Sequence, residues 1–161
     1  MIAVPDEFGV TRATRLDELS WRPSAYAIVL RGPEILLLPY LGGVDLPGGG
    51  IELGESLEEG LLRELEEETG LHGHDPVLVG AASSFFRFDD DCVQSVMLYY
   101  RVAVHPGEPS AANLSAAERE TTGLAAWHPV DGLGALHLPS TVDWRPYVAA
   151  ARNLTDPRGG T

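Results

Sequence analysis

The feature that most constrains this chain is a glycine-rich stretch followed at once by a helical pattern. Residues 40–54 contain six glycines. Such a density opposes helix formation, because glycine loses the most backbone freedom on folding. Residues 56–69 instead carry leucines at helical spacing, and Gly70 follows where a C-cap glycine ends a helix. The leucines that form this apolar face are Leu57, Leu61, Leu62 and Leu65.

The same helix carries a cluster of acidic side chains. Glu64, Glu67 and Glu68 are spaced i, i+3 and i+4, so they share one helix face. Like charges at this spacing repel one another, and a divalent cation removes the conflict because hard cations take carboxylate oxygens. The glycines ahead of the helix allow a ligand to approach the backbone closely. A metal, carboxylates and a glycine loop together indicate chemistry on a substrate that carries phosphates.

Composition excludes several classes of function. The chain of 161 residues suits one domain, with 24 acids against 11 bases and a net charge of −13. This charge disfavours binding to nucleic acid and to anionic membrane surfaces. All eleven bases are arginines, so an enzyme that needs a catalytic lysine, such as a P-loop or Schiff-base enzyme, is excluded.

The sequence also predicts a cytoplasmic location. No apolar run approaches the roughly 20 residues of a membrane helix, and the first residues lack the basic-then-apolar pattern of a secretory signal. The single Cys92 cannot form an internal disulfide, which agrees with a reducing compartment.

The order of the predicted elements indicates a mixed α/β domain. We expect an N-terminal arm over residues 1–23, one domain over 24–154 and a flexible tail over 155–161. Apolar runs predict strands at residues 25–30, 35–38, 76–84, 92–104 and 124–130, the first two joined as a hairpin. Residues 106–122 are expected to form a loop and 133–139 a short helix or turn. Residues 142–154 should form a helix that bends near Pro146.

The glycines and acids of residues 49–71 match a known pattern. This segment resembles the box of the Nudix hydrolases, G-x5-E-x7-R-E-U-x-E-E-x-G-U, in which U is a bulky aliphatic residue. Every fixed position is filled, by Gly49, Glu55, Arg63, Glu64, Leu65, Glu67, Glu68, Gly70 and Leu71. The resemblance implies an α/β/α sandwich with a mixed β-sheet over about residues 24–154.

The resemblance also implies a metal site. Glu64, Glu67 and Glu68 would bind Mg²⁺, for which Mn²⁺ could substitute, and the backbone at Gly49 would complete the site. Glu67 and Glu68 are the expected direct ligands.

The same resemblance implies which residues take part in catalysis. Glu64, Glu67 and Arg63 belong to the catalytic set, with Arg63 orienting the glutamates by ion pairing. Glu55 would either hold the geometry of loop and helix or join the outer shell of the metal, and Gly70 would have a structural role. In this family the general base is a box glutamate or a glutamate on a late loop; here that loop offers Glu118 and Glu120, of which we favour Glu120.

The implied reaction is Mg²⁺-dependent hydrolysis of a diphosphate bond in a small nucleotide, either a nucleoside triphosphate or a nucleoside diphosphate linked to another group. The alternative is a catalytically idle domain that binds a nucleotide as a sensor. Residues 86–88 hold neither the proline typical of ADP-ribose pyrophosphatases nor the tyrosine typical of diadenosine polyphosphate hydrolases. Several members of the family are homodimers, so a dimer is a further possibility.

Substrate-binding residues are expected among aromatic and basic side chains outside the box. Tyr40 and Phe86 could stack on a base, and Arg31 and Arg87 could contact phosphates. The competing interpretation is core packing for the aromatic residues and a solvated surface for the arginines.

Overall fold

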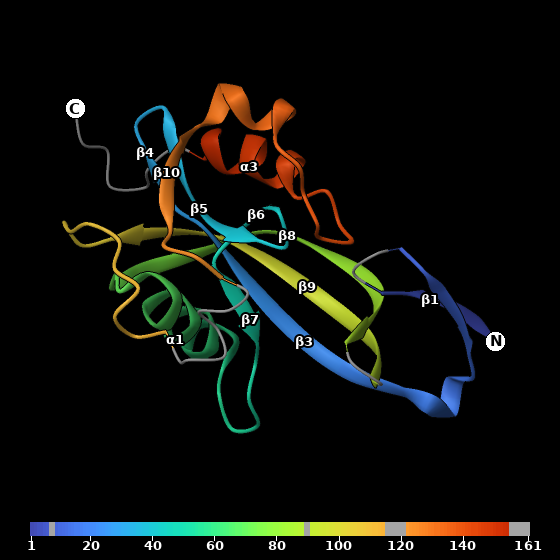
Figure 1. Cartoon of the computed structure of the whole chain (residues 1–161). Coiled ribbons are helices and arrows are strands. Elements are labelled where there is room, and N and C mark those ends of the chain that lie inside the picture. Colours follow the sequence, from blue (N-terminus) through green and yellow to red (C-terminus); the bar gives the residue numbers. More distant parts are fainter. Residues whose placement is uncertain (7–8, 89–90, 115–121, 155–161) are drawn as a thin grey trace.

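The computed structural model describes residues 1–6, 9–88, 91–114 and 122–154, and Figure 1 shows their arrangement. Its main sheet has the strand order β7-β3-β9-β8. These strands are β3 (Leu19–Ile28), β7 (Gly48–Gly50), β8 (Gly73–Phe88) and β9 (Asp91–Val104). β3 runs parallel to β9, whereas β7 and β8 pair antiparallel with their neighbours. The predicted mixed sheet is therefore confirmed.

A second sheet continues from the first through a bend after Ile28. It contains β4 (Leu30–Arg31), β5 (Glu34–Tyr40), β6 (Gly43–Asp45) and β10 (Ala126–Pro129), with β5 paired to the other three. The turn between β4 and β5 uses Gly32 at a φ of +57°, a conformation that glycine adopts without steric cost. The predicted hairpin is confirmed, although its first strand is only two residues long.

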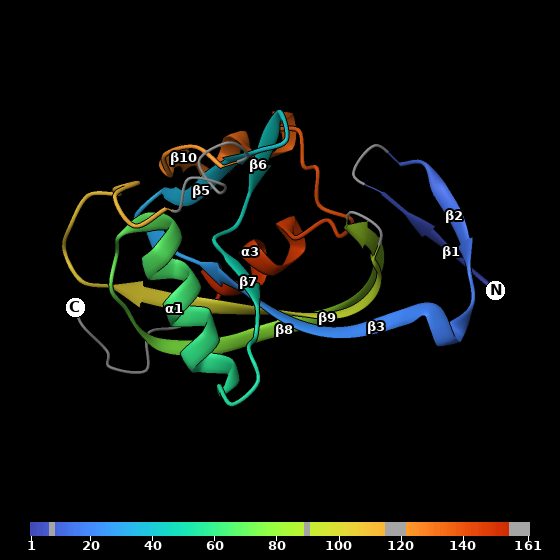
Figure 2. The ribbon, with the colours of Figure 1, turned by 60° about the horizontal axis from the view of Figure 1, so that its bottom comes forward.

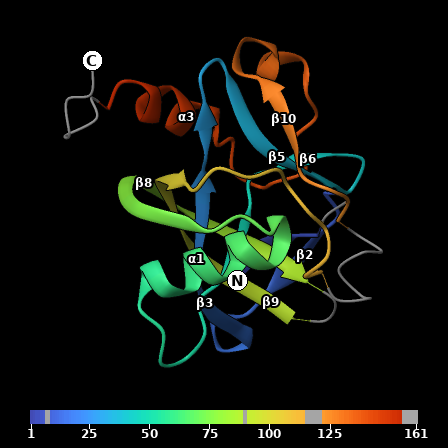
Figure 3. The same cartoon turned by 90° about the vertical axis from the view of Figure 1, so that its left-hand side faces the viewer.

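Two helices cover opposite faces of these sheets, α1 (Leu57–Thr69) and α3 (Arg145–Arg152), and Figures 2 and 3 show strands lying between them. Side chains alternate across a strand, so neighbouring residues of β3 and β5 enter different cores. The core under α1 includes Ala25, Ala27, Leu36, Leu38, Leu61 and Leu65. The core under α3 includes Ile28, Ile35, Leu37, Tyr99, Trp144 and Val148. This layering confirms the predicted α/β/α sandwich.

The N-terminal residues form regular structure that the sequence did not predict. β1 (Ile2–Pro5) and β2 (Thr11–Thr14) make an antiparallel hairpin, followed by the 3-10 helix η1 (Leu16–Glu18). Figures 1 and 2 show the hairpin at the end of β3 that lies away from α1. β3 itself begins at Leu19, so residues 19–23, placed in the arm by the sequence, pair with β9.

Several predicted bounds also differ. β8 continues to Phe88, because its pairing with β9 extends through the phenylalanines that were expected to follow the strand. The 3-10 helix η2 covers Val130–Ala135, earlier than the predicted 133–139. Pro146 lies in the first turn of α3, where its missing N–H costs nothing, so the expected bend is wrong. Residues 106–114 form no helix or strand; 115–121 and the tail from 155 lie outside the described residues.

The leucine face of α1 is narrower than its spacing predicts. Leu61 and Leu65 are fully buried and Leu62 packs against the same core, whereas Leu57 in the first turn is 36 % exposed. Leu57 lies at the end of the helix, where less of the core covers it, and the spacing of the leucines alone does not show this.

A matched pair of truncations tests this assignment. Leu62→Ala should lower the free energy of unfolding by about 1–2 kcal/mol, since it removes partly buried packing. Leu57→Ala should lower it by less, about 0.5–1 kcal/mol, because this side chain is 36 % exposed. Urea denaturation of both variants measures the difference, and equal losses would contradict the assigned helix orientation.

Among the residues that the structure describes, no helix is both long and apolar enough to cross a bilayer.

Candidate active site

The acidic helix is fixed at both of its ends by its own sequence. The Ser56 side chain accepts a hydrogen bond from the Glu59 amide while the Glu59 carboxylate accepts one from the Ser56 amide, a reciprocal capping box. At the other end Gly70 forms the C-cap with a φ of +69°. These caps fix the helix register and therefore the direction in which its glutamates point.

The glycine loop lies directly against both β3 and α1. Gly48 pairs with Tyr26 at a φ of +144°, and a Cβ atom at this position would collide with the carbonyl oxygen of Ala25. A Cβ on Gly49 would lie 2.8 Å from the Glu64 carboxyl group. Consecutive glycines are thus required for the backbone to fit between the strand and the carboxylates.

Arg63 is the hub of the carboxylate cluster. Its Nε and Nη2 donate to both oxygens of Glu55 at 2.7 and 3.0 Å, and its Nη1 donates to Glu64 at 3.0 Å and Glu67 at 3.1 Å. Nη2 also donates to the Gly50 carbonyl oxygen at 3.2 Å, which ties the helix to the glycine loop. One guanidinium thus offsets the repulsion among three carboxylates and orients them.

The electrostatic environments of these carboxylates differ. The hydrogen bonds from Arg63 lower the pKa of Glu55 to about 2, because they stabilise the ionised form. The pKa of Glu64 is instead raised, chiefly because burial penalises its charge. These neighbours raise the pKa of Arg63, which keeps it charged at any pH at which the protein is folded.

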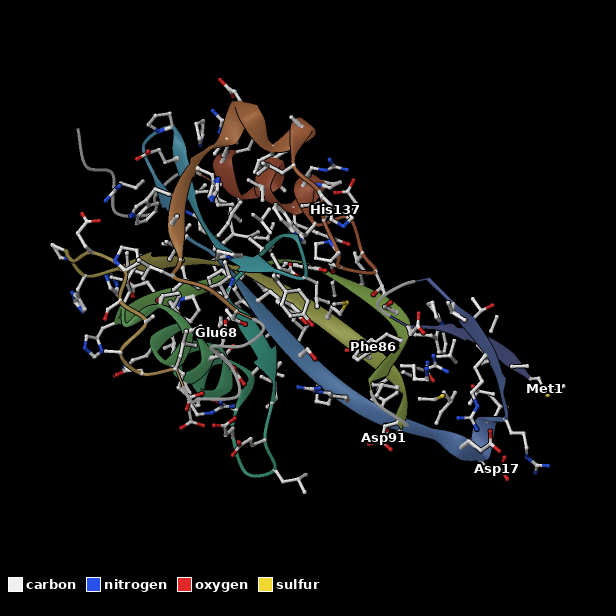
Figure 4. The ribbon with its side chains drawn as sticks, in the orientation of Figure 1. Met1, Asp17, Glu68, Phe86, Asp91 and His137 are labelled. Atoms are coloured by element: carbon white, nitrogen blue, oxygen red, sulfur yellow. The ribbon has the colours of Figure 1, made fainter. Side chains whose placement is uncertain are left out.

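Glu68 joins the cluster to the loop from the last turn of α1. Its carboxylate accepts a hydrogen bond of 2.8 Å from the Gly48 amide, and Figure 4 shows it on the side of the helix near β7. Of the glutamates predicted as metal ligands, Glu64 and Glu67 are thus linked through Arg63, and Glu68 is held by the loop amide. Across the described ranges, however, no three His, Cys, Asp or Glu side chains are grouped as a preformed metal site. The carboxylates are engaged by Arg63 and by the loop amide instead.

The acid dependence of stability tests the Arg63–Glu55 pair. Because the folded-state pKa of Glu55 lies below its unfolded value of about 4.3, the pair contributes stability at neutral pH, which is lost as pH falls from about 5 to 2. Glu55→Gln should therefore flatten the acid limb of a plot of urea midpoint against pH. Glu52→Gln, on the same loop with an exposed side chain, is the control. Parallel acid limbs for the wild type and Glu55→Gln would contradict the pair's role.

A pocket of about 120 Å³ lies against the first part of the glycine-rich stretch, residues 40–45. It contains three of the side chains that the sequence proposed for substrate binding, Tyr40, Phe86 and Arg87. Figure 4 shows Phe86 on β8, toward the N-terminal hairpin. The remaining lining residues are Asp6, Tyr26, Leu41, Asp45, Met97, Pro139, Ser140 and Thr141.

Other predicted residues have different surroundings. The Arg31 guanidinium lies 4.0 Å from the centre of the Trp127 ring and forms ion pairs with Glu34 and Glu108, so the structure does not bring it into this pocket. Glu118 and Glu120 lie outside the described residues. Thr122, two residues after Glu120 in the sequence, forms a bridge with the pocket residue Tyr40.

Sequence reasoning missed part of the pocket. Tyr26 lies within an apolar run that predicted only a buried strand, yet its side chain reaches the pocket from β3. Asp6 contributes from the N-terminal hairpin by pairing with Arg87 of β8. Asp45 was assigned no role from the sequence, and it too lines the pocket.

Comparison with known proteins agrees with this geometry. The family model of the NUDIX domain matches residues 21–151. An uncharacterized Nudix hydrolase of Bacillus subtilis is 32 % identical over 102 residues, covering 62 % of this chain and 61 % of that protein. An ADP-ribose pyrophosphatase of Methanocaldococcus jannaschii is 42 % identical over 62 residues, covering 35 % of this chain and 37 % of that protein. The match thus spans less than two thirds of either relative.

A solved structure is similar over a larger share of its length. The MutT mutator protein of Bacillus halodurans superposes with a TM-score of 0.59 at 28 % identity, covering 73 % of this chain and 74 % of that one.

Proposed function

The chain belongs to the Nudix family, and on that premise we propose that it is a Mg²⁺-dependent pyrophosphohydrolase that cleaves a diphosphate bond in a small nucleotide. The observation that carries the proposal is the carboxylate cluster of α1 near an aromatic pocket: Glu64 and Glu68 contact the glycine loop, and Glu67 is held by Arg63. The alternative, a sensor that only binds nucleotide, has no comparable need for all three carboxylates.

The donor set suits a hard divalent cation. Glu64, Glu67 and Glu68 offer carboxylate oxygens, and the backbone carbonyl at Gly49 lies on the loop that the Glu64 carboxyl group touches. We propose that these groups hold Mg²⁺, with Mn²⁺ as a substitute, after the glutamates leave their present partners. The bound ion would polarise water and offset charge on the phosphates.

Arg63 would serve as a positioning residue. Its fork on Glu55 fixes the guanidinium, so that Nη1 can guide Glu64 and Glu67 without itself touching the substrate. Its positive charge stabilises the ionised form of Glu55 and offsets part of the cost of burying Glu64.

The proton of the attacking water needs a carboxylate acceptor. We propose Glu120 for this role, with Glu64 as the box residue that could replace it. Glutamine substitutions at the two positions distinguish these assignments. The variant that lacks the general base should have a strongly reduced kcat, and its kcat should no longer vary with pH through the pKa of that base. Nucleotide binding should persist in both variants.

The pocket would hold the nucleoside part of the substrate. Tyr40 and Phe86 offer aromatic surface to a base, and Arg87 contributes a positive charge that is paired with Asp6. The name of the Methanocaldococcus jannaschii relative, an ADP-ribose pyrophosphatase, supports a substrate with a diphosphate bond. Arg31 is better explained by its contacts with Trp127 and Glu108 than by a phosphate.

Product release across a panel of substrates tests the proposal. The panel holds canonical and oxidised nucleoside triphosphates, ADP-ribose, sugar nucleotides, dinucleoside polyphosphates and a 5′-triphosphorylated RNA, each with Mg²⁺ and with EDTA. We expect metal-dependent cleavage of a small nucleotide and no preference for the RNA. Cleavage of a triphosphate is read as pyrophosphate or phosphate, and cleavage of the other substrates as phosphate that alkaline phosphatase frees from their phosphomonoester products. If no member of the panel is cleaved while a nucleotide raises the melting temperature, the enzyme proposal fails and the sensor is supported.

A further inference from the structure

One acidic side chain in the pocket has no role in the site described so far. Asp45 ends β6, and its carboxylate reaches the pocket beside Tyr26 and Tyr40. The other acid of the lining, Asp6, is ion-paired with Arg87. Within the described part of the chain Asp45 forms no ion pair with Arg or His, so its charge is not offset by a cation. Burial of an acid without a counter-ion costs free energy, which hydrogen bonds from the protein or from a ligand can offset.

Asp45 retains capacity to accept hydrogen bonds. The Leu46 amide donates to its Oδ1 at 2.8 Å, and the buried indole of Trp144 is its other polar neighbour. A carboxylate offers about four acceptor positions, so those that face the pocket remain for a ligand. Burial raises the pKa of Asp45 to about 6, so at neutral pH the group is mostly ionised and accepts hydrogen bonds without donating any.

The chemistry of this pocket selects among nucleobases. Aromatic rings accept any base, whereas a bidentate hydrogen bond to an ionised carboxylate requires two adjacent N–H donors on the base edge. Guanine presents its ring N1–H beside its 2-amino group, and a carboxylate can accept from both in a bidentate arrangement. Adenine, cytosine, uracil and thymine each place an acceptor atom next to their donor, which the carboxylate would repel.

We propose that Asp45 determines base specificity by accepting hydrogen bonds from the N1–H and 2-amino groups of a guanine nucleotide. The inference rests on the proposed function, because it identifies the base of that same substrate.

The position of Asp45 relative to the phosphate site agrees with this proposal. Asp45 precedes Gly48 by three residues, so their Cα atoms lie at most about 10 Å apart. Tyr26 is close to both ends of this span. It pairs with Gly48 in the sheet. Its pKa is raised chiefly by burial and also by the negative charges of Asp45 and Glu68, which must therefore lie near its hydroxyl group. A base held at Asp45 would therefore lie close enough to the glycine loop for the phosphates of the same nucleotide to reach it.

The test compares nucleotides that differ only at the edge that Asp45 would contact. The wild type should show a kcat/KM for GTP that exceeds that for ITP, which lacks the 2-amino group, by roughly 10- to 100-fold. Asp45→Asn keeps an oxygen for the Leu46 amide and adds an N–H donor. That donor matches the 2-oxo group of xanthine, so the ratio of kcat/KM for XTP to that for GTP should rise by at least about 100-fold. Asp131→Asn, whose side chain is 94 % exposed, is the matched control.

Binding without catalysis separates the two proposals. Calorimetric titrations with GMP, IMP, AMP and XMP in EDTA should show the same order of affinity, with GMP preferred by the wild type and XMP by Asp45→Asn. Equal kcat/KM values for GTP and ITP, a preference for ATP, or an unchanged order in folded Asp45→Asn would overturn the role of Asp45 while leaving the hydrolase intact. Absence of turnover with a retained GMP preference would instead overturn only the proposed function. If Asp45→Asn fails to fold, the comparison of GTP with ITP and of GMP with IMP and AMP in the wild type still tests the role of Asp45.

Discussion

Replacement of Glu67 by glutamine is expected to reduce turnover by roughly 10³-fold or more while changing stability little. The side chain of Glu67 is 44 % exposed and its single described ion pair, with Arg63 Nη1, is 3.1 Å long. Such a partly exposed contact contributes little to folding, so the change acts mainly on the proposed metal site. Steady-state rates with saturating Mg²⁺, measured beside the urea midpoint, provide the comparison.

The neighbouring residue supplies the control for this prediction. Glu66→Gln removes the same charge from the same helix, but Glu66 points toward His72 and not toward Arg63. We expect Glu66→Gln to retain turnover within about threefold, since its carboxylate lies outside the cluster. Similar losses in both variants would show that net charge, and not a specific ligand, governs the rate.

Alanine substitutions at the adjacent residues Gly48 and Gly49 should affect different properties: the first mainly stability, the second mainly turnover. Gly48→Ala should lower the free energy of unfolding by roughly 3–6 kcal/mol, because its Cβ meets the Ala25 backbone at a φ of +144°. The backbone of β3 cannot move aside without breaking its pairing with β7. Thermal and urea denaturation measure this loss.

Gly49→Ala places its Cβ 2.8 Å from the carboxyl group of Glu64, the end of a flexible side chain. We expect the protein to fold with a loss of no more than about 1–2 kcal/mol, because this carboxyl group can rotate away. Turnover should nevertheless fall by at least about 10²-fold, since the displaced Glu64 no longer faces the loop. A folded and fully active Gly49→Ala variant would contradict the proposed place of Glu64 in the site.

The contrast between α1 and the pocket shows which parts of the site the sequence can predict. The helix and its caps are specified by contacts within residues 56–70, so their spacing alone predicted them. The box glutamates follow from the same local pattern, because helical geometry fixes which residues share a face. The structure agrees with these expectations apart from the exposed Leu57.

The pocket depends on contacts between segments that are distant in the sequence. Asp6, Tyr26 and Arg87 come from β1, β3 and β8 or the segments beside them, and their meeting depends on the parallel pairing of β3 with β9. No local spacing encodes that pairing. The sequence therefore named Tyr40, Phe86 and Arg87 by residue type alone and overlooked Asp45, whose importance is visible only once Tyr26 and Trp144 surround it.

The central claim is that the carboxylates of α1 hold the divalent metal. Electron paramagnetic resonance of Mn²⁺ titrated into the wild type, Glu67→Gln, Glu68→Gln and Glu66→Gln measures this most directly. We predict that the wild type and Glu66→Gln bind Mn²⁺ with similar affinity and that Glu67→Gln and Glu68→Gln bind it at least about 10-fold more weakly. Equal affinity in all four proteins would place the metal elsewhere and contradict the account.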